Sequence, residues 1–133
     1  MTHRLAIIGL GIMGRRMLEN ALQHPAFEVS GVWDPSADSV AKTRQALPAA
    51  PVAESAQAAM AGADVVYLAC PPGPRKAYAL QAAVAGQGVF MEKPLGTDNA
   101  QSRDLLAQLS QARLPGVVNF TQAASRGFEE LQR

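Results

Sequence analysis

The chain has 133 residues, which is the length of one domain, and 48% of them are hydrophobic, so it can bury a core without disulfides or metals. Its 12 basic and 11 acidic residues are mixed along the chain and give a net charge of +1, which supplies no basic field for nucleic acid or an anionic membrane. The single cysteine, Cys70, excludes an intrachain disulfide and a cysteine-built metal site. His3 and His24 are too isolated to suggest a metal.

The first apolar segment follows Arg4 and resembles the start of a secretory signal. Glycines interrupt it, however, Arg15 and Arg16 follow it, and no small-residue cleavage site stands out. The sequence also lacks the run of about 18 uninterrupted apolar residues that a membrane-spanning helix needs. We therefore interpret the segment as a strand and expect a soluble, cytoplasmic protein.

Residues 5–14, LAIIGLGIMG, form an apolar run that breaks into three glycines spaced G-x-G-x-x-G. The pattern predicts a buried strand, a tight turn and the start of a helix. In a dinucleotide-binding fold, Gly9 allows the turn, Gly11 lets backbone approach a pyrophosphate, and Gly14 lets the helix pack closely on the strand. The first N–H groups of that helix lack intrahelical partners and can bind a phosphate. A glycine-rich turn without a ligand is the alternative.

An acidic residue follows the second predicted strand. Helical spacing over residues 12–24 ends at Pro25, and residues 27–33 alternate and are rich in β-formers, which predicts a strand. Asp34 closes this strand, 20 residues after Gly14. A dinucleotide fold has an acid at this position, where it accepts hydrogen bonds from the adenosine ribose. An aspartate that forms a turn before proline is the alternative interpretation.

Strands and helices continue to alternate to the end of the chain. We predict helices over 36–47, 54–62, 75–85 and 98–112, strands over 65–70, 89–92 and 117–120, at most a brief edge strand over 49–53, and the beginning of a helix over 125–133. Asp98 and Gln101 have the spacing of a capping box. The short connections predict an α/β fold, a doubly wound (Rossmann), mostly parallel sheet of about six strands with helices on both faces.

Four motifs lie at the predicted carboxyl ends of the strands, where ligands of such sheets bind. They are G-L-G-I-M-G at 9–14, Asp34, C-P-P at 70–72 and E-K-P at 92–94. In this order and spacing they resemble the Gfo/Idh/MocA family of NAD(P)-dependent oxidoreductases, which includes glucose-fructose oxidoreductase and inositol dehydrogenase. The glycines are common to all dinucleotide folds, whereas E-K-P before a capped helix is specific to the family. The resemblance covers nearly the whole chain and implies the N-terminal dinucleotide-binding domain.

The resemblance implies a role for each residue of the first two motifs. The pyrophosphate would be held by Gly9, Gly11 and Gly14 with the N–H groups of Ile12 and Met13. Asp34 would hold the adenosine ribose and favour NAD over NADP, because a 2′-phosphate would meet a carboxylate and no arginine follows directly to receive it.

For the other two motifs, the resemblance implies contacts on the nicotinamide side of the cofactor. Cys70, Pro71 and Pro72 would shape the loop there, and Glu92 would help position the neighbouring loop. Lys93 would be the catalytic or substrate-orienting residue, because an ammonium can hydrogen-bond a substrate hydroxyl and stabilise its developing negative charge. A solvated loop lysine is the alternative. Cys70 lacks a neighbouring base and is interpreted as a small buried residue rather than a nucleophile.

The sequence departs from the family pattern at several positions. Arg75 stands where histidine is common, Gln87 and the following glycine replace a common Lys-His, and Asn119 is not followed by the usual arginine or Tyr-Arg. Trp33 could flank the adenine or belong to the core.

Members of the family continue into a second, α+β domain that supplies the substrate pocket and usually the oligomer interface. We therefore expect residues 1–120 to form the NAD-binding domain and residues 121–133 to begin the connection to a C-terminal substrate domain absent from this chain. The complete protein would transfer hydride between NAD and a hydroxyl carbon of a sugar, polyol or similar substrate, with little turnover from this chain alone. A homo-oligomer is left open. A non-catalytic dinucleotide-sensing or protein-interaction module and a nonfunctional remnant are the alternatives.

Overall fold

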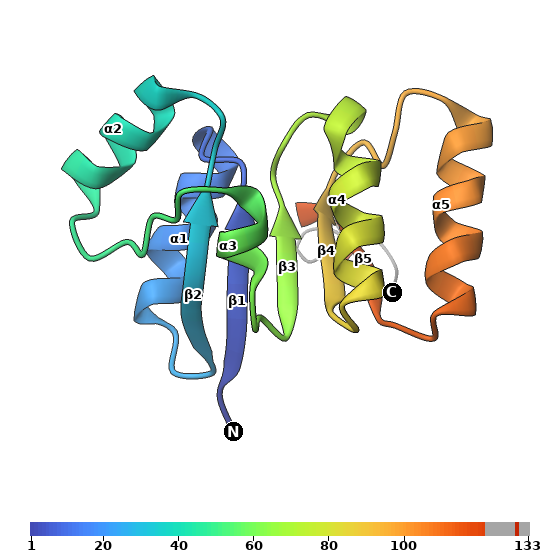
Figure 1. Ribbon diagram of the computed structural model, residues 1–133, viewed down its shortest axis with the longest axis horizontal. Helices are drawn as coiled ribbons and strands as arrows, with labels where there is room; N and C mark the ends of the chain where they lie inside the picture. The colour runs from blue at the N-terminus through green and yellow to red at the C-terminus, as the bar shows by residue number, and fades with distance from the viewer. Residues whose placement is uncertain (122–129, 131–133) are drawn as a thin grey trace.

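The computed structural model describes residues 1–121 and residue 130. Strands and helices alternate along these residues (Figure 1). The elements are β1 (His3–Ile8), α1 (Ile12–Gln23), β2 (Phe27–Trp33), α2 (Ala37–Ala46), α3 (Ala56–Met60), β3 (Val65–Leu68), α4 (Pro72–Val84), β4 (Gly88–Glu92), α5 (Asn99–Gln111) and β5 (Gly116–Asn119).

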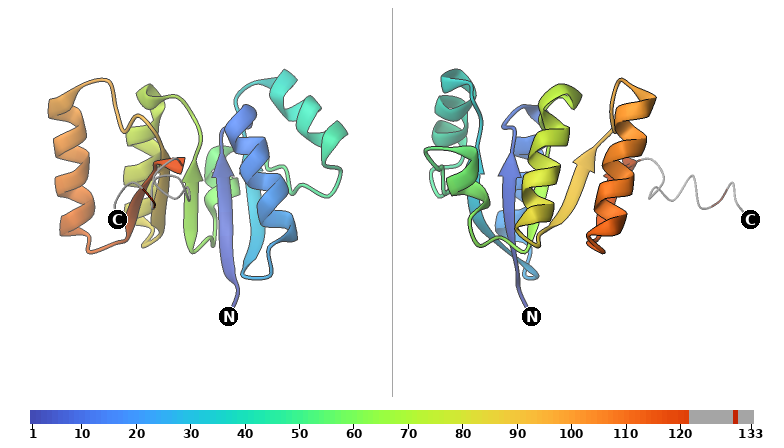
Figure 2. Two further views of the ribbon diagram at one scale, coloured as in Figure 1. Left: turned by 180° about the vertical axis from the view of Figure 1, so that it is seen from behind. Right: turned by 45° about the vertical axis from the view of Figure 1, so that its right-hand side comes forward.

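The strands form one parallel sheet in the order β2-β1-β3-β4-β5. The chain moves from β1 outwards to β2, returns to β3 on the other side of β1, and then continues to β4 and β5. Helix α1 covers one face of the sheet, and α3, α4 and α5 lie on the other (Figures 1 and 2). This is the predicted doubly wound α/β fold, and its strand order reverses between β1 and β3, which is where ligands of such sheets bind.

The described part of the sheet has five strands where about six were predicted. The missing one is the segment 49–53, which contributes a single bridge between Val52 and Val32. Pro51 lacks an N–H group and cannot donate to a ladder, so the pairing does not extend into a strand. The predicted helix over 125–133 and the connection 121–133 lie outside the described residues, apart from Thr121 and Glu130.

Helix α4 begins at Pro72, three residues before the predicted start at Arg75. The prediction placed the run from Pro71 to Pro74 in the break after the preceding strand and began the helix only after it. Proline is tolerated in the first helical turn, because the N–H group that it lacks would have no intrahelical partner there. The C-P-P motif therefore leads directly into the N-terminus of a helix.

The core lies on both faces of the sheet. Ile7 and Ile8 are adjacent in β1 and both have 0% exposed surface, Ile7 in the cluster beneath α1 and Ile8 in the cluster beneath α3 and α4. Burial of such a side chain contributes about 1.5–3 kcal/mol. Two buried faces explain why the central strands are apolar throughout instead of alternating.

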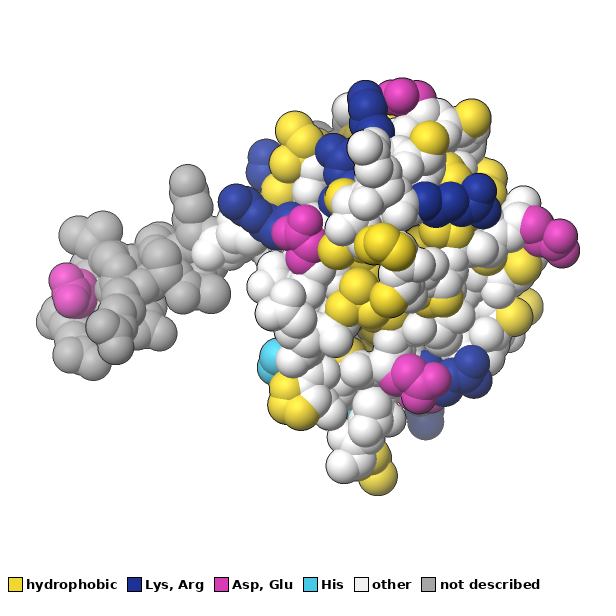
Figure 3. Space-filling model, turned by 90° about the vertical axis from the view of Figure 1, so that its left-hand side faces the viewer, with side chains coloured by type: hydrophobic (Ala, Val, Ile, Leu, Met, Phe, Trp, Pro, Cys, Tyr) yellow, Lys and Arg dark blue, Asp and Glu magenta, His cyan; other side chains and the backbone are white. Residues whose placement is uncertain are grey.

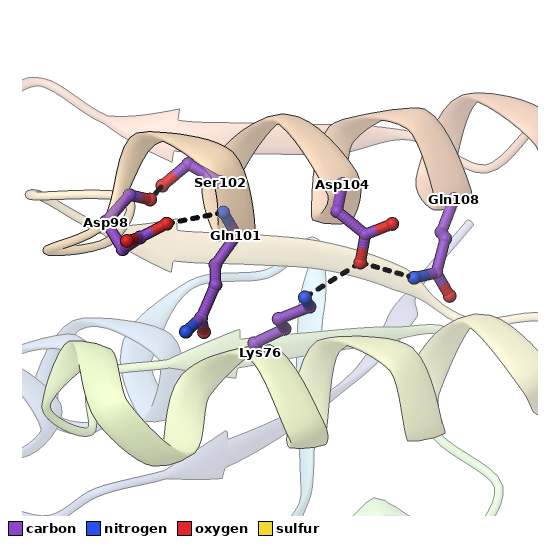
Figure 4. Close-up of polar contacts among 6 residues, drawn as sticks. All are labelled: Lys76, Asp98, Gln101, Ser102, Asp104 and Gln108. Carbon is purple, nitrogen blue, oxygen red and sulfur yellow. Dashed lines mark hydrogen bonds and ion pairs between the residues drawn. The ribbon is translucent and has the colours of Figure 1, made fainter.

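Helix α5 is fastened at its start and along its side (Figure 4). The Asp98 carboxylate accepts a hydrogen bond of 2.8 Å from the backbone N–H of Gln101, which confirms the predicted N-cap. The Nζ of Lys76 in α4 lies 2.7 Å from the Oδ2 of Asp104 in α5. The same oxygen accepts a hydrogen bond from the Gln108 side chain. Of these contacts, the ion pair between Lys76 and Asp104 joins α5 to α4.

Candidate functional site

A cleft of about 810 Å³ opens at the carboxyl edge of the sheet. This volume is in the range of small-molecule and cofactor sites. Of the residues predicted to bind a cofactor, those that line the cleft are Gly9, Gly11, Met13, Asp34, Cys70, Pro71, Pro72, Glu92 and Lys93. Ile12 and Gly14 do not line it: the Ile12 side chain is exposed, and Gly14 is buried beneath the turn. The fold therefore brings all four motifs to one cavity.

The glycine turn is built by close backbone contacts. Gly9 has a φ of +100°, and a Cβ there would lie 2.6 Å from the backbone nitrogen of Cys70. A Cβ on Gly14 would lie 1.8 Å from the carbonyl oxygen of Gly9, so α1 can only pack this closely on β1 if residue 14 is glycine. By contrast, a Cβ on Gly11 would meet no protein atom within 4 Å. Space at Gly11 is open towards the cleft.

The N-terminus of α1 faces this open space without a side-chain cap. Gly11 is the N-cap residue and provides no side-chain hydrogen bond, and the first turn of α1 contains no acidic residue. The N–H groups of Ile12 and Met13 have no carbonyl partner within the helix, and the helix dipole adds positive potential there. These features fit an anionic group bound at the end of α1.

Asp34 ties the glycine turn to the end of β2. One carboxylate oxygen accepts a hydrogen bond of 2.7 Å from the N–H of Leu10, and the other accepts one of 2.7 Å from the N–H of Ser36. The second contact is the turn-forming role that the sequence left open. The contact with Leu10 was not predicted. Each oxygen keeps a second lone pair, so the same carboxylate can accept further bonds from a ligand.

Two aromatic rings stand beside Asp34 in the cleft. The rings of Trp33 and Tyr78 are 6.3 Å apart between centroids and meet edge to face at 67°. Both also pack against the core, so Trp33 belongs to the core and to the cleft wall. Burial, followed by the nearby Cys70 and Asp34, raises the pKa of the Tyr78 hydroxyl. Tyr78 was missed because it lies within a helix whose pattern indicates only packing.

Arg75, noted in the sequence only as a departure, is buried at the floor of the site. It is 2% exposed, and its guanidinium donates to three backbone carbonyls. Nη1 donates to the carbonyl oxygens of Glu92, at 2.5 Å, and Pro94, and Nη2 donates to that of Cys70 at 2.6 Å. One side chain therefore joins the segment after β3 to the loop after β4.

The Glu92 side chain points into the sheet edge and joins three strands. It is 6% exposed, and its Oε1 accepts hydrogen bonds from the Tyr67 hydroxyl and, at 2.6 Å, from the Asn119 side chain. Burial, strengthened by Glu92, raises the pKa of Tyr67 far above its ordinary value. Lys93, the next residue, is exposed at the cleft. The Glu92 side chain thus ties the end of β4 to β3 and β5, next to Lys93.

Cys70 is buried at the edge of the cleft, as its interpretation as a small buried residue requires. Burial raises the pKa of its thiol, an effect that the neighbouring Arg75 opposes. Because the thiolate is the nucleophilic form, this environment does not activate Cys70 at neutral pH.

The chain was compared with known proteins. A family model described as an oxidoreductase family with an NAD-binding Rossmann fold (Gfo/Idh/MocA) matches residues 3–120. The chain belongs to this family. It is 34% identical over 137 aligned residues to the inositol 2-dehydrogenase of Acidiphilium cryptum (strain JF-5), an alignment that covers 99% of this chain and 41% of that protein. The chain thus spans about two fifths of the length of this relative.

Solved structures show the same fold. The UDP-N-acetylglucosamine 3-dehydrogenase GnnA from Acidithiobacillus ferrooxidans superposes with a TM-score of 0.88 at 23% identity, covering 99% of this chain and 43% of that one. GenD2 from gentamicin A biosynthesis, in complex with NAD, gives a TM-score of 0.86 at 22% identity, covering 97% of this chain and 37% of GenD2. At these identities the likeness establishes the fold.

Among the described residues of this Gfo/Idh/MocA domain there is neither a candidate metal centre nor a candidate membrane-spanning helix. Within residues 1–121 and residue 130, no group of three or more His, Cys, Asp and Glu side chains could hold a metal. None of the helices in the same residues combines the length and apolarity needed to cross a bilayer. On the face in Figure 3, basic and acidic side chains lie among hydrophobic and uncharged ones rather than in a patch of one sign.

Proposed function

We propose that this Gfo/Idh/MocA domain binds NAD across the cleft and serves an oxidoreductase that acts on a polyol or sugar. The pyrophosphate would lie at the N-terminus of α1, the adenosine ribose at Asp34, and the nicotinamide near Lys93. The observation that carries the proposal is the convergence of the four motifs on one cleft of about 810 Å³. The open space at Gly11 and the uncapped end of α1 fit the pyrophosphate.

NAD is favoured over NADP by the surroundings of Asp34. Its two oxygens each accept one backbone N–H and can accept further bonds from ribose hydroxyls. A 2′-phosphate at the same place would be repelled by the carboxylate. The family description as NAD-binding and the NAD bound to GenD2 support the same cofactor.

The reaction class follows from Lys93 together with the relatives. Bound NAD supplies a hydride acceptor at its nicotinamide ring. The Lys93 ammonium would hydrogen-bond the oxygen of the substrate alcohol and stabilise the negative charge that this oxygen acquires as the hydroxyl proton passes to solvent; that charge would be consumed in forming the carbonyl as the carbon gives its hydride to NAD. The inositol 2-dehydrogenase relative suggests a cyclic polyol as the substrate class. Residues 1–120 would form the cofactor domain, and residues 121–133 would lead to the part that completes the substrate pocket.

A titration with NADH tests the cofactor proposal. Trp33 is the single tryptophan and lines the cleft, so its fluorescence reports binding by energy transfer to the reduced nicotinamide. We expect saturable binding, which Gly11→Arg weakens by at least about tenfold because the new side chain fills the pyrophosphate space. Gly73→Arg is the matched control, since a Cβ at Gly73 also meets no atom within 4 Å and Gly73 does not line this cleft.

Two results would contradict the cofactor proposal. One is a native chain that shows no saturable NADH binding. The other is equal binding by the native chain and Gly11→Arg while both have the same circular dichroism spectrum.

A further inference from the structure

The guanidinium of Arg75 holds both sides of Lys93. Its Nη1 donates to the carbonyl oxygens of Glu92 and Pro94, which are the residues immediately before and after Lys93. Its Nη2 donates to the carbonyl of Cys70, in the segment between β3 and α4. The side chain of Lys93 is exposed and the side chain of Arg75 is 2% exposed. A buried cation thus fixes the backbone from which the exposed cation extends.

The chemistry of arginine suits this arrangement. Its guanidinium is planar, remains charged at any physiological pH and presents its donors in a rigid fork. A lysine ammonium has no such fork, and a neutral imidazole has a single donor. The three carbonyl acceptors belong to two segments, one after β3 and one at the end of β4. A single rigid group therefore sets the position of these two segments relative to each other. Removing that group would leave the carbonyls of Cys70, Glu92 and Pro94 without this donor and the Lys93 loop without its anchor on α4.

The hydrogen bonds of Arg75 lie in one half of the cleft, the half that contains Lys93. Asp34 and the glycine turn are held by their own backbone bonds, through Leu10 and Ser36, and none of these bonds involves Arg75. The bonds of Arg75 all go to the segments around Cys70 and Lys93. A change at Arg75 should therefore affect the Lys93 half and leave the Asp34 half in place.

We propose that Arg75 is a positioning residue that holds the Lys93 loop in the conformation that binds the nicotinamide half of the cofactor. This inference rests on the proposed function, because it requires NAD to lie across the cleft. Arg75 acts through the backbone of Glu92, Lys93 and Pro94 rather than on the reacting atoms.

The test compares NADH with ADP-ribose, which lacks the nicotinamide, by calorimetry on the full 133-residue chain. Arg75→Met keeps a similar apolar stem and removes every donor. We expect Arg75→Met to weaken NADH binding about tenfold, which is the effect of one lost hydrogen bond to a charged group. The affinity for ADP-ribose should change by less than about threefold. Arg75→Lys should recover part of the NADH affinity, and Arg103→Met, an exposed position on α5, should change neither ligand.

Each of the other results of this comparison would contradict either the role of Arg75 or the proposed function. If Arg75→Met weakens both ligands equally, or neither, Arg75 does not position the nicotinamide half. If Arg75→Met fails to fold, Arg75→Lys decides alone by the same ratio of the two affinities. If the native chain binds neither ligand, the proposed function itself is wrong, whereas native binding with an unchanged ratio in the variants overturns only the inference on Arg75.

Discussion

Asp34 uses both oxygens of its carboxylate within the protein, one on Leu10 and one on Ser36. Asp34 also lines the cleft, and each of its oxygens keeps a second lone pair that can accept a bond from a ligand. Structural anchoring and ligand binding are therefore compatible roles for one residue. The two backbone bonds also fix the position of the Asp34 carboxylate in the site, which bears on the choice between NAD and NADP.

Asp34→Asn tests that charge. The amide keeps an acceptor oxygen but removes the negative charge that opposes a 2′-phosphate. We expect the native chain to bind NADH at least about tenfold more tightly than NADPH, and the variant to narrow this ratio. The dissociation constants of both cofactors are measured side by side, with Asp38→Asn on the exposed face of α2 as the control. An unchanged ratio would show that Asp34 does not select the cofactor.

Tyr67 makes the free energy of unfolding depend on pH in the alkaline range. Burial, followed by the hydrogen bond to Glu92, raises its pKa above the ordinary value of 10.0. Because the folded pKa is the higher one, this contribution to stability is fully present below the unfolded pKa and is lost as the pH rises above it. The free energy of unfolding should therefore fall above about pH 10.

Tyr67→Phe removes both the titrating group and a donor to buried Glu92. We expect the variant to be less stable at pH 7 by about 1–3 kcal/mol and to lose less stability than the native chain as the pH rises. Urea unfolding between about pH 7 and 11 measures both effects. Parallel pH profiles for the two proteins would contradict the role of Tyr67 in the alkaline loss.

At the scale of elements, the start of α5 depends on one side chain. Asp98→Ala removes the carboxylate that accepts from the Gln101 N–H, and an N-cap of this kind contributes about 1 kcal/mol. The ion pair between Lys76 and Asp104 is expected to contribute less, because Asp104 is exposed and water screens the pair. We expect Asp98→Ala to lower the free energy of unfolding more than Asp104→Ala does, as urea unfolding would show. The reverse order would mean that the ion pair, not the cap, fastens α5.

Elements with strong local signals could be predicted from the sequence. The Gly9 turn and the Asp98 cap are determined by the residues themselves and appear as predicted. The apolar run after Asp64 forms the predicted strand, β3, which ends at Leu68 rather than at Cys70. The predicted start of α4 at Arg75 was three residues too late, because proline signals a break except in the first turn of a helix, and α4 begins at Pro72.

The side-chain partners of the site could not be predicted in the same way. Arg75 is distant in sequence from the carbonyls of Glu92 and Pro94, and only the parallel packing of β3 and β4 brings them together. Tyr78 reaches the cleft because it lies one turn after Arg75 on α4. Motifs identify which residues lie at the sheet edge, whereas packing decides what each of them contacts.

In the proposed function, one continuous cleft of the molecule binds one cofactor. A second groove, lined by Leu5, Phe27 and Val117 among others, lies on the sheet face next to α1 and is almost wholly apolar. A charged dinucleotide has no counterpart there, whereas the cleft offers the end of α1, Asp34 and Lys93. NAD is therefore expected to bind in the cleft and not in the apolar groove.

Backbone amide NMR of the chain titrated with NAD tests this claim most directly. We expect saturable shifts at Leu10, Ile12 and Met13 for the pyrophosphate, at Ser36 for the adenosine ribose and at Lys93 for the nicotinamide. The groove residues Leu5, Phe27 and Val117 should not shift. An absence of saturable shifts, or shifts confined to Leu5, Phe27 and Val117, would contradict this claim.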